Sequence, residues 1–262
     1  MREIVSKIDA ALAAFKPITL AEMSGIKLMN RIDAKYLISI NQLPTLLERA
    51  EVDYFAQEID GLRKALYRTV YYDTPNAEMF IIHHNRKLNR QKIRIREYVE
   101  SNRSFLEIKD KNNKGRTRKI RIPVADENIL DKIEAIEFIN EKSNYQAELL
   151  SQRLKNNFSR ITLVNKGKTE RLTIDFYINF SNCVTGVENG LPDLCIIEIK
   201  QDGDIHSPFK DYLLDLRIRK KSISKYCLGM VLTDSSLKAN NFKSKFIYIH
   251  KLLNHGIINT PE

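Results

Sequence analysis

Alternating basic residues carry the chemistry that this sequence suggests. Lys92, Arg94 and Arg96 take every second position of KIRIREY, and Lys119 and Arg121 do the same in RKIRI. Arginine binds a phosphate through two parallel hydrogen bonds, and lysine brings a compact positive charge to it. Residues 86–121 hold 14 Lys or Arg against 4 Asp or Glu, which equals the net charge of +10 of the whole chain.

The spacing separates these cations from the apolar residues between them. Alternation is strand periodicity, so Lys92, Arg94 and Arg96 share one face of a strand, about 6.6 Å apart. Like charges at that distance repel by roughly 0.6 kcal/mol in water and about 2.5 kcal/mol at an effective dielectric near 20. A solvated face tolerates this repulsion, whereas an enclosed face needs an anion. A basic run is more often a solvated surface or a disordered arm, and the alternation argues against that alternative.

The elements that must position these cations favour an enclosed face. Strand patterns lie at residues 65–74, 90–99, 104–111, 116–124, 161–167, 171–180 and 193–201. Helix patterns lie at residues 2–15, 41–50, 126–140, 144–156 and 207–217. Asn41, Asp126 and the pair Ser207-Pro208 supply helix-start signals. If these helices cover the apolar face of the strands, the charged face lines the interior of a barrel.

Length and composition limit the class of protein. The chain has 262 residues, of which 43% are hydrophobic and 29% charged, and this composition is typical of a folded protein. About 18 apolar residues never run together, so neither a signal peptide nor a membrane span is expected. The cysteines at 183, 195 and 227 are scattered, which predicts reduced thiols in a cytoplasmic protein. The nine glycines form neither GxGxxG nor GxxxxGK[ST], and HExxH and GxSxG are absent.

Eight segments, taken in order, resemble a known family. They are RIDAKYLIS (31–39), YRTVYYDT (67–74), KIRIREY (92–98), FLEIKDK (105–111), RKIRI (118–122), RLTIDF (171–176), IIEIK (196–200) and SKYCLG (224–229). Together they are similar to the VTC domain of the triphosphate tunnel, or CYTH-like, superfamily. The resemblance covers roughly residues 25–232.

The resemblance implies an α+β fold with a closed antiparallel β-barrel, helices packed outside, and a lumen that holds polyphosphate. The activity it implies is transfer of the γ-phosphate of ATP to a growing inorganic polyphosphate chain. The implied cofactor is a divalent metal, Mn²⁺ first and Mg²⁺ as the alternative. We expect one domain, 1–262, with a core at about 25–232 and two appendages, a helix at 2–15 and a helical tail at 233–262.

The same resemblance assigns roles to single residues. It assigns catalysis to Arg94, Arg96 and Lys109, substrate binding to Lys35, Lys119, Arg160, Arg171 and Lys225, and metal binding to Glu198. Each assignment has an alternative. Lys35 and Lys109 could form ion pairs with Asp33 or Glu107, Glu198 could pair with Lys200, and the other cations could be solvated. Phe158 also replaces the tyrosine that the family often has two residues before Arg160.

Other functions of the same residues stay open. Hydrolytic relatives carry ExExK on the first strand, where this chain has Arg31, Asp33 and Lys35, and this difference favours the polymerase over a triphosphate hydrolase. A non-catalytic module for polyphosphate or RNA is the third alternative, although no aromatic-rich RNA-binding strand is visible and nucleic acid is not expected. The expected partners are ATP, polyphosphate or triphosphate, and a separate membrane protein that would hold the chain at the inner face of a membrane.

Overall fold

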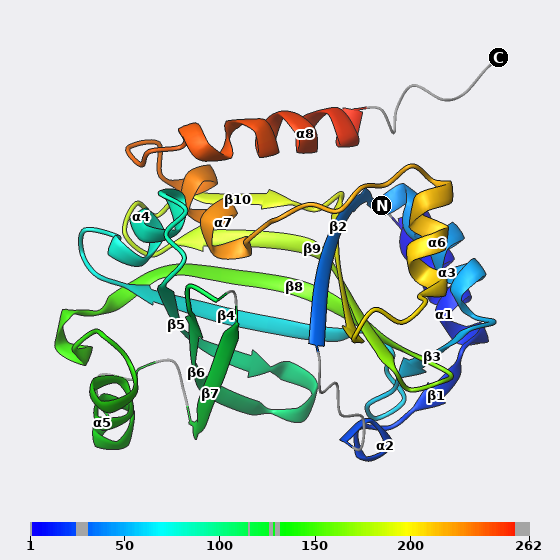
Figure 1. Cartoon of the computed structure of the whole chain (residues 1–262), viewed down its shortest axis with the longest axis horizontal. Helices are drawn as coiled ribbons and strands as arrows, with labels where there is room; N and C mark the ends of the chain where they lie inside the picture. The colour runs from blue at the N-terminus through cyan, green and yellow to red at the C-terminus, as the bar shows by residue number, and fades with distance from the viewer. Residues whose placement is uncertain (1, 25–30, 115, 126–127, 129–131, 255–262) are drawn as a thin grey trace.

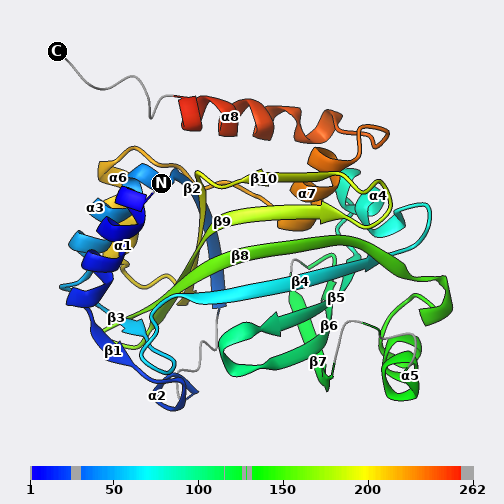
Figure 2. The ribbon, with the colours of Figure 1, turned by 180° about the vertical axis from the view of Figure 1, so that it is seen from behind.

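The chain folds into one strongly curved sheet flanked by helices, as a computed structural model shows (Figures 1 and 2). The structure describes residues 2–24, 31–114, 116–125, 128 and 132–254. The strands are β1 (Lys16–Ile18), β2 (Arg31–Ser39), β3 (Tyr54–Gln57), β4 (Ala65–Asp73), β5 (Arg90–Tyr98), β6 (Arg103–Lys111), β7 (Thr117–Val124), β8 (Ser151–Asn165), β9 (Glu170–Asn182), β10 (Glu188–Leu191) and β11 (Leu194–Asp202). The helices are α1 (Arg2–Ala14), α2 (Leu20–Ser24), α3 (Leu43–Ala50), α4 (Glu78–His84), α5 (Ile133–Lys142), α6 (Pro208–Asp215), α7 (Lys225–Thr233) and α8 (Lys243–Asn254). Among the described residues, no helix is long and apolar enough to span a bilayer.

The strands of the main path pair in the order β2-β11-β9-β8-β4-β5-β6-β7, and every neighbouring pair on this path is antiparallel. The end strands β2 and β7 are steeply inclined to the central strands β8 and β9 (Figure 1). Within the described residues, β2 and β7 share no hydrogen bonds. The prediction of a closed barrel is therefore wrong in this respect, because the sheet curls but its edges do not pair.

The two edges are occupied or blocked in different ways. The carbonyl of Lys35 on β2 accepts a hydrogen bond from the backbone N–H of Lys221, 2.7 Å away, so the chain before α7 occupies part of this edge. On β7, Pro123 has no N–H to offer a partner strand, and Lys119 and Arg121 are exposed. These features explain why the edges stay apart.

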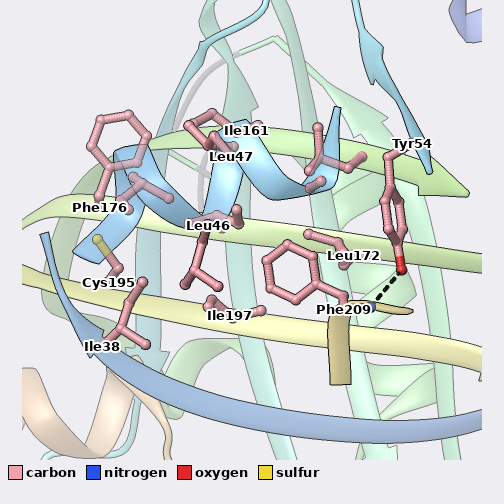
Figure 3. Close-up of a cluster of buried hydrophobic side chains, with 14 of the residues drawn as sticks. Ile38, Leu46, Leu47, Tyr54, Ile161, Leu172, Phe176, Cys195, Ile197 and Phe209 are labelled. Atoms are coloured by element: carbon pink, nitrogen blue, oxygen red, sulfur yellow. Dashed lines mark hydrogen bonds between the residues drawn. The ribbon is translucent and has the colours of Figure 1, made fainter. Parts of the chain in front are cut away.

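The outer face of β2, β8, β9 and β11 packs against α1, α3 and α6. Figure 3 shows this cluster, in which Ile161, Ile197 and Leu46 are fully buried. Full burial of one such side chain contributes about 1.5–3 kcal/mol. The Tyr54 hydroxyl donates to Glu170 at 2.5 Å and accepts from the backbone N–H of Phe209 at 3.1 Å, which ties α6 to the sheet (Figure 3).

The outer face of β4 to β7 packs against α5. Ile93 and Ile95 of β5 lie in one buried cluster with Ile139 of α5. Because side chains alternate along a strand, the cations between these isoleucines point to the opposite face. The expectation that helices cover the apolar face is confirmed here, and we call the opposite, concave face the inner face.

Helix α7 packs on part of the inner face. Ile196 lies in its cluster whereas the next residue, Ile197, lies in the cluster under α3 and α6, so the two clusters occupy opposite faces of β11. Gly229 of α7 allows close approach, because a Cβ there would stand 2.5 Å from atoms of Leu154 and Phe180. One part of the inner face is therefore apolar and covered by α7, and another part is charged.

Most predicted elements are confirmed, with one error. The predicted helix at 144–156 is wrong: a single 3-10 turn spans Ala147–Leu149 and β8 begins at Ser151. Pairing of β8 with β4 and β9 outweighs the weak helical pattern of this segment. Of the predicted helix at 126–140, positions 126, 127 and 129–131 lie outside the described residues, as do 25–30 of the predicted core and 255–262 of the tail.

Candidate functional site

Charged side chains cover the part of the inner face that α7 leaves free. They alternate along each strand with residues of the outer clusters. They include Lys35 on β2, Lys92, Arg94 and Arg96 on β5, Glu107 and Lys109 on β6, Lys119 on β7, Arg160 on β8, Arg171 and Asp175 on β9, and Glu198 and Lys200 on β11. Lys225, the first residue of α7, adds another cation. Cations clearly outnumber carboxylates on this face.

Glu107 holds two of the cations in place. Arg94 Nε and Nη2 donate to one carboxylate oxygen at 2.9 and 2.7 Å, and Lys119 Nζ donates to the other at 2.8 Å. Burial alone would raise the pKa of Glu107, which has no solvent exposure, but Arg94, Arg96 and Lys119 together hold it well below its usual value. Glu107 is therefore charged, and it orients Arg94.

Asp175 forms a second cluster, with Arg160 and Lys225. Arg160 donates from Nε and Nη2 to the two carboxylate oxygens at 2.5 and 2.7 Å, and Lys225 Nζ forms an ion pair with the same group. Burial opposes the charge of Asp175, but its two cations lower its pKa well below the usual value. Asp175 is thus the partner of both cations, and the contact with Lys225 fastens α7 to β9.

Phe158 takes a different role from the tyrosine that the family often has at this position. Lys225 Nζ lies 3.2 Å from the centroid of the Phe158 ring, and the Arg160 guanidinium lies 5.2 Å from it. The ring of Tyr67 stacks on Phe158 at 5.3 Å. Phe158 therefore supports two cations through its ring, and the phenolic hydrogen bond to phosphate is missing, as the sequence indicates.

Arg96 and Lys109 differ from the cations above, since neither forms an ion pair with a carboxylate of the described residues. Arg96 is 9% exposed, and its Nε is buried without a hydrogen-bond partner. Burial, followed by the charges of Arg94 and Arg160, lowers the pKa of Arg96. The charge of Arg94, followed by burial, lowers the pKa of Lys109 well below its usual value. In the part of the chain that the structure describes, these two enclosed cations thus lack a carboxylate partner.

Glu198 lies between Lys35 on the neighbouring strand β2 and Lys200 on its own strand β11. Its carboxylate is 2.7 Å from Lys200 Nζ and 3.8 Å from Lys35 Nζ. Burial raises the pKa of Glu198, but the two lysines outweigh it and hold the pKa well below the usual value. The alternative pair of Glu198 with Lys200 is therefore present, and Lys35 forms a second, longer ion pair with the same carboxylate.

Residues 223–225 connect strands from both ends of the sheet. Lys35 Nζ donates to the carbonyl of Ile223 at 3.4 Å, and Lys92 Nζ donates to the Ser224 hydroxyl at 2.8 Å. Burial lowers the pKa of Lys92 to about 8. The charges of Glu198 on β11 and Lys35 on β2, at the opposite end of the path, also affect the pKa of Lys109 on β6. The curl of the sheet thus brings these groups close together.

All nine predicted residues share the inner face, but they do not form a single cluster. Lys119 is 39% exposed at the open edge of β7, while Arg171 stands opposite Lys200 on the neighbouring strand. The family resemblance assigns no role in the site to Lys92 or Lys200, although both lie on this face. The alternation in KIRIR and IEIK places both on the charged face, and this signal would have found them.

A divalent metal fits this face only when a phosphate substrate supplies some of its ligands. In the part of the chain that is described, no three His, Cys, Asp or Glu side chains are grouped to hold a metal. Of the three carboxylates that hold the inner cations, Glu198 is the most accessible, with 24% exposure against 7% for Asp175 and none for Glu107. A Mg²⁺-like ion needs only one or two carboxylates when phosphates and water supply its other ligands. The residues therefore fit a metal that arrives with a phosphate substrate.

Comparison with known proteins gives one strong match. The family model of the VTC domain matches residues 30–233. No curated protein matches the chain in sequence.

Several solved structures share a weaker likeness with the chain. A candidate adenylate cyclase from Vibrio parahaemolyticus has a TM-score of 0.44 at 12% identity, over 77% of this chain and 99% of that one. A Pyrococcus horikoshii protein has a TM-score of 0.42 at 16% identity, over 77% and 98%. A candidate adenylyl cyclase from Hippeastrum, described as having a dominant triphosphatase activity, has a TM-score of 0.45 at 13% identity, over 78% and 96%. At these TM-scores the likenesses add nothing to the family match.

Proposed function

Because its family model matches residues 30–233, the chain belongs to the VTC domain family, and we propose that it builds inorganic polyphosphate from ATP. The observation that supports this proposal best is the pair of enclosed cations, Arg96 and Lys109, which lack a carboxylate partner among the described residues. Buried charges without a partner are costly in a folded protein. A chain of phosphates would supply one negative charge after another along this face.

The substrate phosphates would lie along β5 and β6. Arg94 is held by Glu107 and can turn its remaining N–H groups to a phosphate, and Arg96 offers a buried Nε that has no other partner. Lys109 lies opposite Lys92 and Lys119 on the neighbouring strands, so three ammonium groups stand side by side across the sheet. Fixed donors in a site that excludes water stabilise phosphate charge more strongly than donors in water.

The reaction asks little covalent chemistry of the protein. A terminal oxygen of the polyphosphate chain attacks the γ-phosphorus of ATP, the new P–O bond forms, and the bond to ADP breaks with ADP as the leaving group. The attacking oxygen is already ionised near neutral pH, so no general base is needed. The cations align donor and acceptor and stabilise the charge on the transferred group.

Glu198 would hold the divalent metal, Mn²⁺ or Mg²⁺, together with the phosphates. When bound, such an ion neutralises charge on the phosphate oxygens and orients the donor. Lys35 and Lys200, which flank Glu198, would then bind phosphate oxygens in place of the carboxylate. From the family resemblance we also propose that a separate membrane protein receives the polymer at the cytoplasmic face of a membrane.

The test is incubation of the purified chain with ATP and Mn²⁺, followed by electrophoresis of the products. We expect a ladder of long phosphate chains, and Arg96→Gln should remove it. Arg118→Gln is the matched control, because Arg118 is an exposed cation next to Lys119 on β7 whose side chain alternates to the opposite face. Release of free phosphate without chains would indicate a hydrolase instead, and binding without turnover would indicate a polyphosphate-binding module.

A further inference from the structure

A row of cations on β5 leads from the interior to the surface. Arg96, Arg94, Lys92 and Arg90 occupy alternate positions and share the inner face. At about 3.3 Å per residue the row spans roughly 20 Å, which is longer than three linked phosphates. Arg96 and Arg94 are buried, whereas Lys92 and Arg90 are partly exposed, so exposure increases toward Arg90.

Aromatic rings close the other end of the row. Tyr98, the next inner-face position after Arg96, packs against Tyr67 at 5.0 Å and Phe105 at 5.9 Å between ring centroids. Tyr67 in turn stacks on Phe158. These rings offer no positive charge to a phosphate, so the cationic row continues in one direction only.

At the Arg90 end, the row continues into a group of basic side chains at the surface. We call Arg86, Lys87, Arg90 and Lys245 the basic rim. Arg90 Nη1 donates to the carbonyl of Lys87 at 2.7 Å, and the charges of Arg86 and Arg90 contribute to lowering the pKa of Lys245 after its burial. Arg86 and Lys87 follow α4, and Lys245 lies in α8, so the rim joins two elements distant in sequence (Figure 1).

His83 lies between the inner face and the rim. Burial, followed by the charges of Lys92, Arg90, Lys245 and Lys35, lowers its pKa to about 2. Its Nδ1 is buried and has no hydrogen-bond partner among the described residues. These four charges are all positive, and they come both from the inner face and from the basic rim, so His83 stands near cations of both.

We propose that this basic rim guides the growing polyphosphate chain out of the inner face, past His83, along the side of α4 and α8. The inference rests on the proposed function and adds a direction to it. Short substrates occupy only the enclosed part of the row, whereas chains longer than the row must reach the rim. The rim should therefore affect long chains and leave triphosphate unaffected.

The test compares the affinities of inorganic triphosphate and long-chain polyphosphate for two triple variants. Arg86→Asn/Lys87→Gln/Lys245→Gln removes three rim charges, and asparagine suits position 86 because its φ is 59°. Arg2→Gln/Lys16→Gln/Lys168→Asn is the matched control: it removes three cations on the opposite side, near α1, β1 and the turn between β8 and β9, and Lys168 also has a positive φ.

We expect the rim variant to bind long chains about tenfold more weakly than the unmodified chain does. Its affinity for triphosphate should be unchanged. The slope of log affinity against log salt for long chains should fall by about 2, as for three lost phosphate contacts. The NMR signal of His83 should shift with long chains and not with triphosphate. The proposed role of the basic rim would be contradicted by an equal loss of affinity for both ligands or by no loss for either. An equal loss in the control variant would contradict it as well. If the unmodified chain binds neither ligand, the proposed function itself fails.

Discussion

Two groups of cations lie within reach of each other on the inner face, and they differ in what neutralises them. Arg160 and Lys225 share Asp175 through short, directed contacts. Arg96 and Lys109 have no such partner among the described residues, although both lie in a strongly positive environment. The protein itself neutralises the first group, whereas the second group is neutralised only when an anion binds.

The comparison separates stability from binding. A buried ion pair whose geometry is good holds elements together, and removal of one member leaves a costly charge behind. A buried cation without a partner lowers stability until a ligand arrives. We therefore expect substitutions in the two groups to shift stability in opposite directions, and the first two predictions below test that difference.

The largest effect is expected at Asp175. Asp175→Asn leaves Arg160 and Lys225 without a counter-charge, so the free energy of unfolding should fall by about 3–5 kcal/mol. Urea denaturation measures this loss. Asp110→Asn, a carboxylate on β6 away from this cluster, should change stability by less than about 0.5 kcal/mol. An Asp175 variant as stable as the control would show that the cluster is not structural.

Substitution of the unpaired cations should act in the opposite direction. Arg96→Met and Lys109→Met should each raise the free energy of unfolding of the ligand-free protein by about 1 kcal/mol, since an unpaired charge is lost. Each should weaken triphosphate binding about 10- to 100-fold in calorimetric titration. Arg118→Met on the other face of β7 serves as the control for both measurements. Loss of stability in the Arg96 and Lys109 variants would end the distinction between the two groups.

Glu198 should separate turnover from binding. Glu198→Gln keeps the shape of the side chain, so triphosphate should bind at least as tightly as before, while Mn²⁺-dependent turnover should fall about tenfold or more. Glu97→Gln, whose partner is Arg68 at 3.4 Å, tests the loss of a carboxylate elsewhere. Turnover that persists with Mn²⁺ in the Glu198 variant would place the metal on other residues.

The smallest effect is expected from pH, through Lys92. Its pKa is about 8 in the folded chain, below the ordinary 10.5, so between these values the unfolded chain binds more protons and stability rises with pH. Binding changes in the other direction, because Lys92 loses its charge as pH rises through 8. Triphosphate affinity should fall a few-fold from pH 7 to pH 9, and Lys92→Arg should remove most of that fall. An unchanged pH dependence in Lys92→Arg would exclude Lys92 from the bound surface.

The sequence predicts which residues face inward better than it predicts their partners. Alternation in KIRIREY and IIEIK assigns a face to Arg94 and Glu198, because strand geometry alone determines that face. Partners depend on register between strands. Arg94 stands directly opposite Glu107, and Lys109 stands between two lysines, and neither relation can be read from one strand alone.

The errors of prediction have the same origin. Residues 144–156 look helical by themselves, but pairing with β4 and β9 turns the segment from Ser151 onward into β8. Closure of a barrel needs hydrogen bonds between β2 and β7. On β2, the carbonyl of Lys35 instead accepts a hydrogen bond from the backbone N–H of Lys221. Both outcomes follow from contacts between segments far apart in sequence, which local patterns do not contain.

The open edge of β7 has a consequence for handling the protein. An exposed strand edge can pair with the same edge of a second molecule, and a proline and charged side chains on that edge discourage such aggregation. Pro123, Lys119 and Arg121 stand on β7 in those roles. A change of Lys119 or Arg121 to an apolar residue should therefore lower solubility as well as phosphate affinity, so inactive variants at these positions need light scattering before their inactivity is ascribed to the reaction.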